Sequence, residues 1–177
     1  NNDGKITPAD RTMIGDPTPN VTYGFSLGVD YKNWSFGIDM MGQGGNQIFR
    51  TWDNYNFAQF NYLAQRMDRW HGEGTSNSQP LLNSKHSINT LNSEYYIEDG
   101  KFFRIRNVQL AYSFDKSLLA KIRLQALKVY VNIQNLKTWK HNTGYTPELG
   151  GTATAFGVDN GSYPVPAVYT FGINLTF

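Results

Sequence analysis

The residues at the start of the chain have the types and spacing of a calcium-binding loop. The run Asn1-Asn2-Asp3-Gly4-Lys5-Ile6-Thr7-Pro8-Ala9-Asp10 fits the pattern D-x-N-x-D-G-x-I-x-x-x-D from its third position onward. Calcium prefers oxygen ligands, and this pattern converges several of them. The loop positions 3, 5, 6, 7 and 12 would be filled by Asn1, Asp3, Gly4, Lys5 (through its carbonyl) and Asp10. The first carboxylate would precede residue 1, so we expect a truncated loop; the alternative is an Asn/Asp/Gly turn without metal.

Catalytic chemistry has little support in the sequence. The three histidines, His71, His86 and His141, are scattered, and none lies in an H-E-x-x-H metal motif. No G-x-S-x-G motif occurs, and without cysteine there is no thiol nucleophile, disulfide or Cys-zinc site. The stretch Gly42-Gln43-Gly44-Gly45 is not followed by the Lys-Ser/Thr of a phosphate loop. We therefore expect that the chain is not an enzyme.

Composition narrows the remaining classes of protein. The formal net charge is +2 over 177 residues, a bias too weak to predict a nucleic-acid partner. Mean hydropathy is −0.49, and no apolar run approaches the roughly 18–20 residues of a membrane helix, which excludes a helical membrane protein. A transmembrane β-barrel remains open, because its alternating strands average to a polar composition.

Apolar residues alternate with small or polar ones in five stretches, the period-two pattern of β-strands. The clearest stretch begins at Val21 and continues to Tyr31. Lys32-Asn33 then interrupts the pattern and predicts a two-residue hairpin turn, because Asn tolerates positive φ. The third stretch changes phase near Arg106-Asn107, which predicts a β-bulge. The five alternating stretches are 21–31, 34–40, 103–114, 127–134 and 169–177.

Short and long connections alternate between these stretches. The short connection 115–126 contains a predicted helical turn at 117–122, and the long one that follows residue 44 contains a predicted helix over 56–70. This asymmetry is typical of outer-membrane barrels, which have short periplasmic turns and long external loops. The predicted parts are an external loop 1–20 with the calcium-like motif, a hairpin 21–44, a long external loop 45–100, a hairpin 101–139, an external loop 140–165 and a terminal strand 166–177.

A soluble β-sandwich shows the same alternation, so a secreted β-sandwich carbohydrate-binding module is the alternative function. Three features favour the barrel: the small or moderately polar opposite faces, strands of about ten residues, and a last strand that ends on Phe177. Five strands cannot close a barrel, since the smallest barrels have about eight. We therefore expect an all-β, antiparallel C-terminal portion of a larger barrel, or partner chains that supply the remaining strands.

Several longer runs of the chain follow one another in a specific order. They are Gly15-Asp16-Pro17-Thr18-Pro19-Asn20, Asp99-Gly100-Lys101-Phe102-Phe103-Arg104-Ile105-Arg106-Asn107-Val108-Gln109-Leu110-Ala111-Tyr112-Ser113-Phe114, Val129-Tyr130-Val131-Asn132-Ile133-Gln134-Asn135-Leu136, Thr143-Gly144-Tyr145-Thr146-Pro147-Glu148, and Tyr163-Pro164-Val165-Pro166 with the terminal strand. In sequence and order these runs resemble the SusC/RagA family of TonB-dependent transporters. The resemblance covers nearly the whole chain and is weakest over 50–95. One departure is Thr146-Pro147, where the family more often has an acidic residue before the proline.

The resemblance implies a portion of a roughly 22-stranded, plugged barrel. Such proteins import glycan oligosaccharides or peptides across the outer membrane of Bacteroidota-like bacteria, with the C-terminus periplasmic and the long loops extracellular. The implied partners are a SusD-like surface lipoprotein, TonB through an N-terminal part, the remaining barrel and plug, and outer-membrane lipid. Calcium is the only cofactor that the sequence suggests.

Aromatic residues in or beside the predicted external loops are candidate contacts for sugar rings or for the lipoprotein. They are Trp52, Tyr55, Trp70 and Trp139. The alternative is that they pack the loops together or form the interfacial aromatic girdle.

Polar residues opposite the apolar faces are expected to line the lumen. They are Asp39, Lys128 and Asn132. They either contact the transported solute or form hydrogen bonds across the lumen wall or to the plug.

Overall fold

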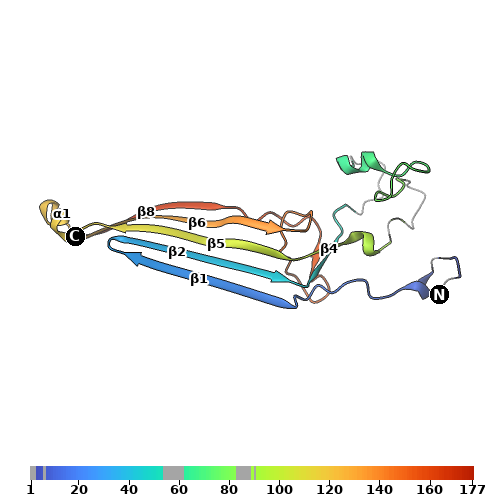
Figure 1. The fold of residues 1–177 in the computed structure, drawn as a ribbon, viewed down its shortest axis with the longest axis horizontal. Helices are drawn as coiled ribbons and strands as arrows, with labels where there is room; N and C mark the ends of the chain where they lie inside the picture. Colours follow the sequence, from blue (N-terminus) through green and yellow to red (C-terminus); the bar gives the residue numbers. More distant parts are fainter. Residues whose placement is uncertain (1–2, 6, 54–61, 83–88, 90) are drawn as a thin grey trace.

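The computed structural model describes residues 3–5, 7–53, 62–82, 89 and 91–177. Its main element is one antiparallel sheet of five strands in the order β1-β2-β5-β6-β8 (Figure 1). The strands are β1 (Val21–Tyr31), β2 (Trp34–Gly44), β5 (Phe102–Ser113), β6 (Ala126–Lys140) and β8 (Val168–Thr176). Each long strand pairs with the next one along the chain, so the prediction of an antiparallel all-β fold is confirmed.

Residues 32–33 form the predicted two-residue turn, because Tyr31 pairs with Trp34. The positive φ expected at Asn33 falls on Lys32 instead, with φ 53°. Asn33 has another role, since its side-chain amide donates a hydrogen bond of 2.8 Å to the carboxylate of Asp115. The β1–β2 turn is thereby tied to the neighbouring connection between β5 and β6.

The predicted bulge lies in β5 at Arg106. Asp39 pairs with Asn107 and Met40 pairs with Ile105, so Arg106 has no partner in β2. On the other side, the β5–β6 register also shifts between Ile105 and Asn107. A bulge adds twist locally and turns adjacent side chains toward one face of the sheet.

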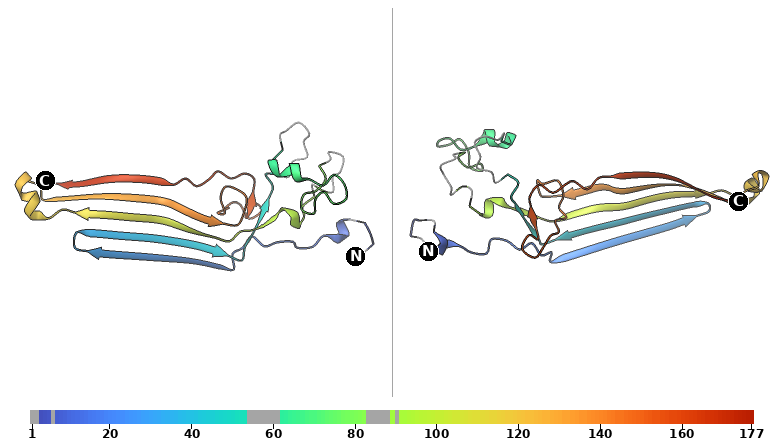
Figure 2. Two further views of the ribbon diagram at one scale, coloured as in Figure 1. Left: turned by 45° about the horizontal axis from the view of Figure 1, so that its top comes forward. Right: turned by 180° about the vertical axis from the view of Figure 1, so that it is seen from behind.

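The two ends of the sheet differ in structure. At one end lie the β1–β2 turn, the C-terminus and the short helices α1 (Lys116–Leu119) and η5 (Ala120–Ile122), as predicted for 117–122 (Figure 1). At the other end lie the N-terminus and the long connections (Figure 2). Long and short connections are therefore segregated to opposite ends.

A second, three-stranded sheet stands among the long connections, where the sequence predicted only loops. Its order is β4-β3-β7, with β3 (Gln47–Arg50), β4 (Ile97–Asp99) and β7 (Val158–Asp159). The β3–β7 pairing is parallel. Strands of two to four residues are too short to produce a readable alternation, and their partners are far away in the sequence.

The helix predicted over 56–70 is wrong for the part that the structure describes. Residues 54–61 lie outside the described residues, and 62–70 contain only the 3-10 helix η2 (Ala64–Asp68). Leu63 and Arg69 are both extended, which ends the helix on either side. Two other short 3-10 helices are η1 (Pro8–Asp10) and η4 (Glu94–Tyr96).

The buried apolar residues gather at the small sheet and at the strand ends rather than along the main sheet. Within the described ranges they are Ile48, Tyr96, Phe102, Ala111, Leu119 and Leu149. The small sheet stands beyond one end of the main sheet and does not cover its face (Figure 1). A β-sandwich needs a second sheet packed on the first, so that alternative is wrong for this fold. No helix among the described residues is long and apolar enough to cross a membrane.

Candidate functional site

The main sheet has one apolar face, because strand register aligns the apolar positions of all five strands. One row across the sheet consists of Leu27, Ile38, Val108, Ile133 and Tyr169. The next row consists of Val29, Phe36, Leu110, Val131 and Phe171. These side chains are not buried inside the chain; Phe171, for example, is 77% exposed. So large an apolar surface requires lipid or another apolar partner.

One charged residue joins this face, which the alternation alone did not predict. Lys137 pairs with Ile105 and so points to the same side of the sheet. It lies beyond the bulge, toward the end of β6 that carries the long connections.

Aromatic rings border the apolar face at both ends. Toward the long connections, Phe103 stacks on Tyr23 and on Trp139, with ring centroids 6.5 and 5.7 Å apart. Toward the short turns, Tyr112 contacts Trp34 and Phe114 with centroid distances of 4.8 and 5.0 Å. Such borders are typical of the two membrane–water interfaces of a transmembrane barrel.

The four candidate contact aromatics do not come together in the structure. Trp139 belongs to the aromatic border on the apolar face, a position that favours the girdle interpretation. Trp52 packs against the guanidinium of Arg50 in the small sheet, 5.8 Å from its ring centroid. Trp70 is partly exposed in the long connection, and Tyr55 lies outside the described residues.

The opposite face of the main sheet is polar and collects the three predicted lumen residues. Asp39 accepts a hydrogen bond of 3.3 Å from the side-chain amide of its row neighbour Asn107. Asn132 lies in a row with Gln109, and Lys128 lies opposite Ser113. The Oδ1 atom of Asn132 is buried and has no hydrogen-bond partner among the described residues. This face suits contact with water or with another polar surface.

A hollow of about 740 Å³ lies at the bulge on the polar face. The polar side chains in its lining are those of Ser26, Asp39, Arg104, Arg106, Asn107, Gln134, Asn135 and Glu148. Glu148 comes from the connection between β6 and β8, so a long connection turns back onto this face.

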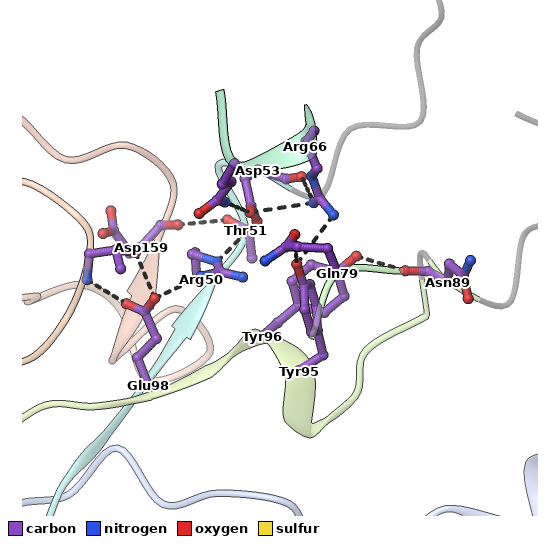
Figure 3. A network of polar contacts seen from close by, with 12 residues as sticks. Arg50, Thr51, Asp53, Arg66, Gln79, Asn89, Tyr95, Tyr96, Glu98 and Asp159 are labelled. Carbon is purple, nitrogen blue, oxygen red and sulfur yellow. Dashed lines mark hydrogen bonds and ion pairs between the residues drawn. The ribbon is translucent and has the colours of Figure 1, made fainter. Parts of the chain in front are cut away.

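A buried charge cluster holds the small sheet to the long connections (Figure 3). Arg50 is central: its Nε lies 3.0 Å from Asp53 and its Nη1 lies 2.8 Å from Glu98. Arg66 of η2 contacts the other Asp53 oxygen at 3.4 Å. Tyr95 lies beneath both guanidinium groups, at 5.4 Å from that of Arg50 and 5.8 Å from that of Arg66. Positive and negative side chains alternate in this cluster, so each buried charge has an oppositely charged partner.

The cluster also joins connections that are distant in the sequence. Thr143 donates to Glu98 through its backbone N–H at 2.9 Å and its hydroxyl at 2.6 Å. The Thr51 N–H donates to the Asp159 carbonyl at 2.9 Å. Burial raises the pKa of the Tyr96 phenol, although the nearby Arg66 acts to lower it. The described parts of the connections before β5 and after β6 are therefore joined to one another, and together they are called the cap.

The calcium-like motif has the turn that such a loop requires. Gly4 has φ 76°, and Lys5 donates its backbone N–H to Asp3 at 2.8 Å. Asp10 accepts the backbone N–H of Thr7 at 2.8 Å, and this hydrogen bond lowers the pKa of the Asp10 carboxyl. Asn1 lies outside the described residues. In the part of the chain that the structure describes, no three His, Asp or Glu side chains lie close enough to hold a metal ion.

Sequence reasoning assigned no role to the buried charges. Arg50, Asp53 and Arg66 lie in a connection without periodicity, so nothing in the sequence pairs them. Arg104 and Glu148 lie within two of the family motifs. The signal that could have identified Arg104 is its charge on the polar side of an alternating strand.

Comparisons with known proteins found relatives and solved structures that match nearly the whole chain. No family model matches it. It is 31% identical to TonB-dependent receptor P3 of Formosa agariphila over 98% of the chain, and 23% identical to TonB-dependent receptor SusC of Bacteroides thetaiotaomicron over 100% of the chain. The solved structure of the RagAB peptide transporter superposes on 93% of the chain with a TM-score of 0.78 and 26% identity.

The chain belongs to the SusC/RagA type of TonB-dependent receptors. It spans 18% of the length of receptor P3, 17% of SusC and 18% of the matched RagAB chain. The antiparallel sheet is consistent with the C-terminal portion of a receptor barrel. These relatives are named as receptors and a peptide transporter.

Proposed function

We propose that the chain forms part of the wall of an outer-membrane, TonB-dependent nutrient importer. Its apolar face contacts lipid, and its polar face contacts the lumen and the plug. The observation that carries this proposal is the register that gathers apolar residues of five strands on one face between two aromatic borders.

The aromatic borders support the membrane orientation by their spacing. Tyr23 and Tyr31 of β1 are eight residues apart, as are Tyr169 and Phe177 at the other edge of the sheet. Eight residues correspond to about 26 Å along the strand, which at the tilt of barrel strands spans about 22 Å across the membrane, near the apolar band of about 25 Å in outer-membrane barrels.

The offset between the two edges supports the strand tilt. Tyr169 lies in the row of Leu27, four residues from Tyr23, so a line from Tyr23 to Tyr169 shifts by about 13 Å along the strands. The line crosses four strand spacings, or about 19 Å, which gives a tilt of about 35°. Barrel strands tilt by roughly 35–45°. The line crosses β6 near Lys137, where a cation reaches the interface.

The segregation of connections supports the proposed orientation. The cap formed by the long connections is extracellular, and the short turns and C-terminus are periplasmic. A SusD-like lipoprotein covers the cap. The plug and the TonB-contacting part belong to the rest of the receptor, and the cargo is a glycan oligosaccharide or a peptide; the RagAB relative is a peptide transporter.

Calcium binding at the start of the chain is also proposed for the intact receptor. Gly4 supplies the turn, and Asp3, Lys5 and Asp10, with Asn1, would hold the ion through oxygen atoms. Calcium bound there would order the segment that leads into β1.

Single-cysteine labelling of the full-length receptor, in a cysteine-free background, tests this function and orientation. Thr152→Cys on the cap should react with a membrane-impermeant maleimide in intact cells. Lys121→Cys on the short-turn side should react only after the outer membrane is permeabilised. Reaction of both in intact cells, or recovery of the receptor in the soluble fraction without detergent, would contradict the proposal.

A further inference from the structure

Arg104 is a buried cation on the polar face of the main sheet. Its neighbours Phe103 and Ile105 belong to the apolar face, so its own side chain points to the other side. Only 4% of Arg104 is exposed, and Phe102 beside it on the same face is only 3% exposed. Something must therefore cover it, and a buried guanidinium needs partners for its donors.

The partners of Arg104 come from the adjacent strand and from the connection between β6 and β8. Its Nε donates to the Thr138 hydroxyl at 2.8 Å. Its Nη1 forms an ion pair with Glu148, and its guanidinium lies 5.6 Å from the Phe102 ring centroid. The hydrogen bond with Thr138 fixes the guanidinium against strand β6, and the ion pair with Glu148 fixes the β6–β8 connection against the guanidinium.

The connection around Glu148 is folded so that it can meet Arg104. The Asn142 amide donates to the Thr146 carbonyl at 3.0 Å, and the Thr146 hydroxyl accepts the Glu148 N–H at 3.2 Å. Asn142, Thr146 and Leu149 are all buried. This segment (141–150) therefore forms a compact unit that carries one carboxylate toward the polar face.

We propose that Arg104 and Glu148 are a positioning pair that fastens segment 141–150 over the polar face. The segment narrows the import path above the hollow at the bulge, so the pair sets how much of Asp39, Arg106 and Asn107 the cargo can reach. This inference rests on the proposed importer function and adds a residue pair that controls the shape of its lumen.

Glu148→Gln in the full-length receptor tests the pair, with Glu73→Gln as the matched control. Glu73 is an exposed carboxylate in the other long connection. Hydrogen exchange of segment 141–150 should become about tenfold faster or more in Glu148→Gln, because the buried Arg104 guanidinium loses its negatively charged partner. Glu73→Gln should leave that exchange unchanged.

The charge swap Arg104→Glu with Glu148→Arg separates pairing from general damage. The double variant should restore slow exchange of segment 141–150, whereas Arg104→Glu alone should lose it. Unchanged exchange in Glu148→Gln, or no rescue by the swap, would overturn the proposed role of the Arg104–Glu148 pair. These outcomes are scored only on receptor recovered in the outer-membrane fraction; an absence of wild-type receptor there would instead contradict the proposed function.

Discussion

An arginine placed at mid-height on the apolar face should destabilise the receptor far more than one on the polar face. Ile173 lies midway between Tyr169 and Phe177, the aromatic borders of β8, and is 66% exposed. The roughly 26 Å of strand between these two borders, tilted by about 35°, spans about 22 Å across the membrane, so Ile173 lies roughly 11 Å from each interface. Ile173→Arg should therefore cost roughly 2–4 kcal/mol, as measured for arginine at a bilayer midplane.

Two neighbours provide the controls. Tyr169→Arg at the border should cost only about 0–1 kcal/mol, because the guanidinium reaches the headgroups. Asn174→Arg, the next residue but on the polar face, does not enter lipid, so it should cost only the repulsion from Lys128 opposite it, about 0.2–1 kcal/mol. The assay is urea unfolding of the full-length receptor in lipid vesicles, followed by the gel shift between folded and unfolded barrel.

The order of the three losses in unfolding free energy tests whether the apolar face contacts lipid. Equal losses for Ile173→Arg and Asn174→Arg would refute the assignment of the apolar face to lipid. A larger loss for Tyr169→Arg than for Ile173→Arg would refute the position of the membrane along β8.

Three other predictions concern the cap and the first residues of the chain. Arg50→Met should destabilise the small sheet by roughly 3–5 kcal/mol, because it leaves the buried carboxylates of Asp53 and Glu98 without their cation. Hydrogen exchange of β3 measures this loss. Removing a cation from an exposed ion pair should cost at most about 1 kcal/mol. Burial acts to raise the pKa of Asp99, but its contacts with Lys101 outweigh this and lower it, so Asp99 contributes stability above its usual pKa of 3.8 that is lost as the pH falls through the folded value. Asp99→Asn should flatten that part of the acid unfolding curve. Calorimetry on the intact receptor should detect calcium binding that the Asp3→Asn variant weakens; no calcium heat in the wild type would contradict the loop.

Local pattern in the sequence was enough to predict the long strands. Period-two alternation places side chains on opposite faces of any strand, so stretches such as 21–31 and 169–177 identify themselves without knowledge of their partners. The turn at 32–33 and the bulge at Arg106 follow from the same pattern, because each appears where the phase changes. The family motifs added the receptor identity, which alternation cannot supply.

Tertiary structure decided which distant groups meet. The small sheet depends on pairs such as Phe49 with Val158, whose strands are too short to show a period. The pairing of Arg50 with Glu98, and of Arg104 with Glu148, joins residues that are more than forty positions apart in the sequence. Charge–charge contacts leave no spacing signal in a single sequence, because attraction depends on distance in space and burial. The sequence by itself therefore determined a sheet with one apolar and one polar face. Only the tertiary structure determined how the long connections are fixed to that sheet.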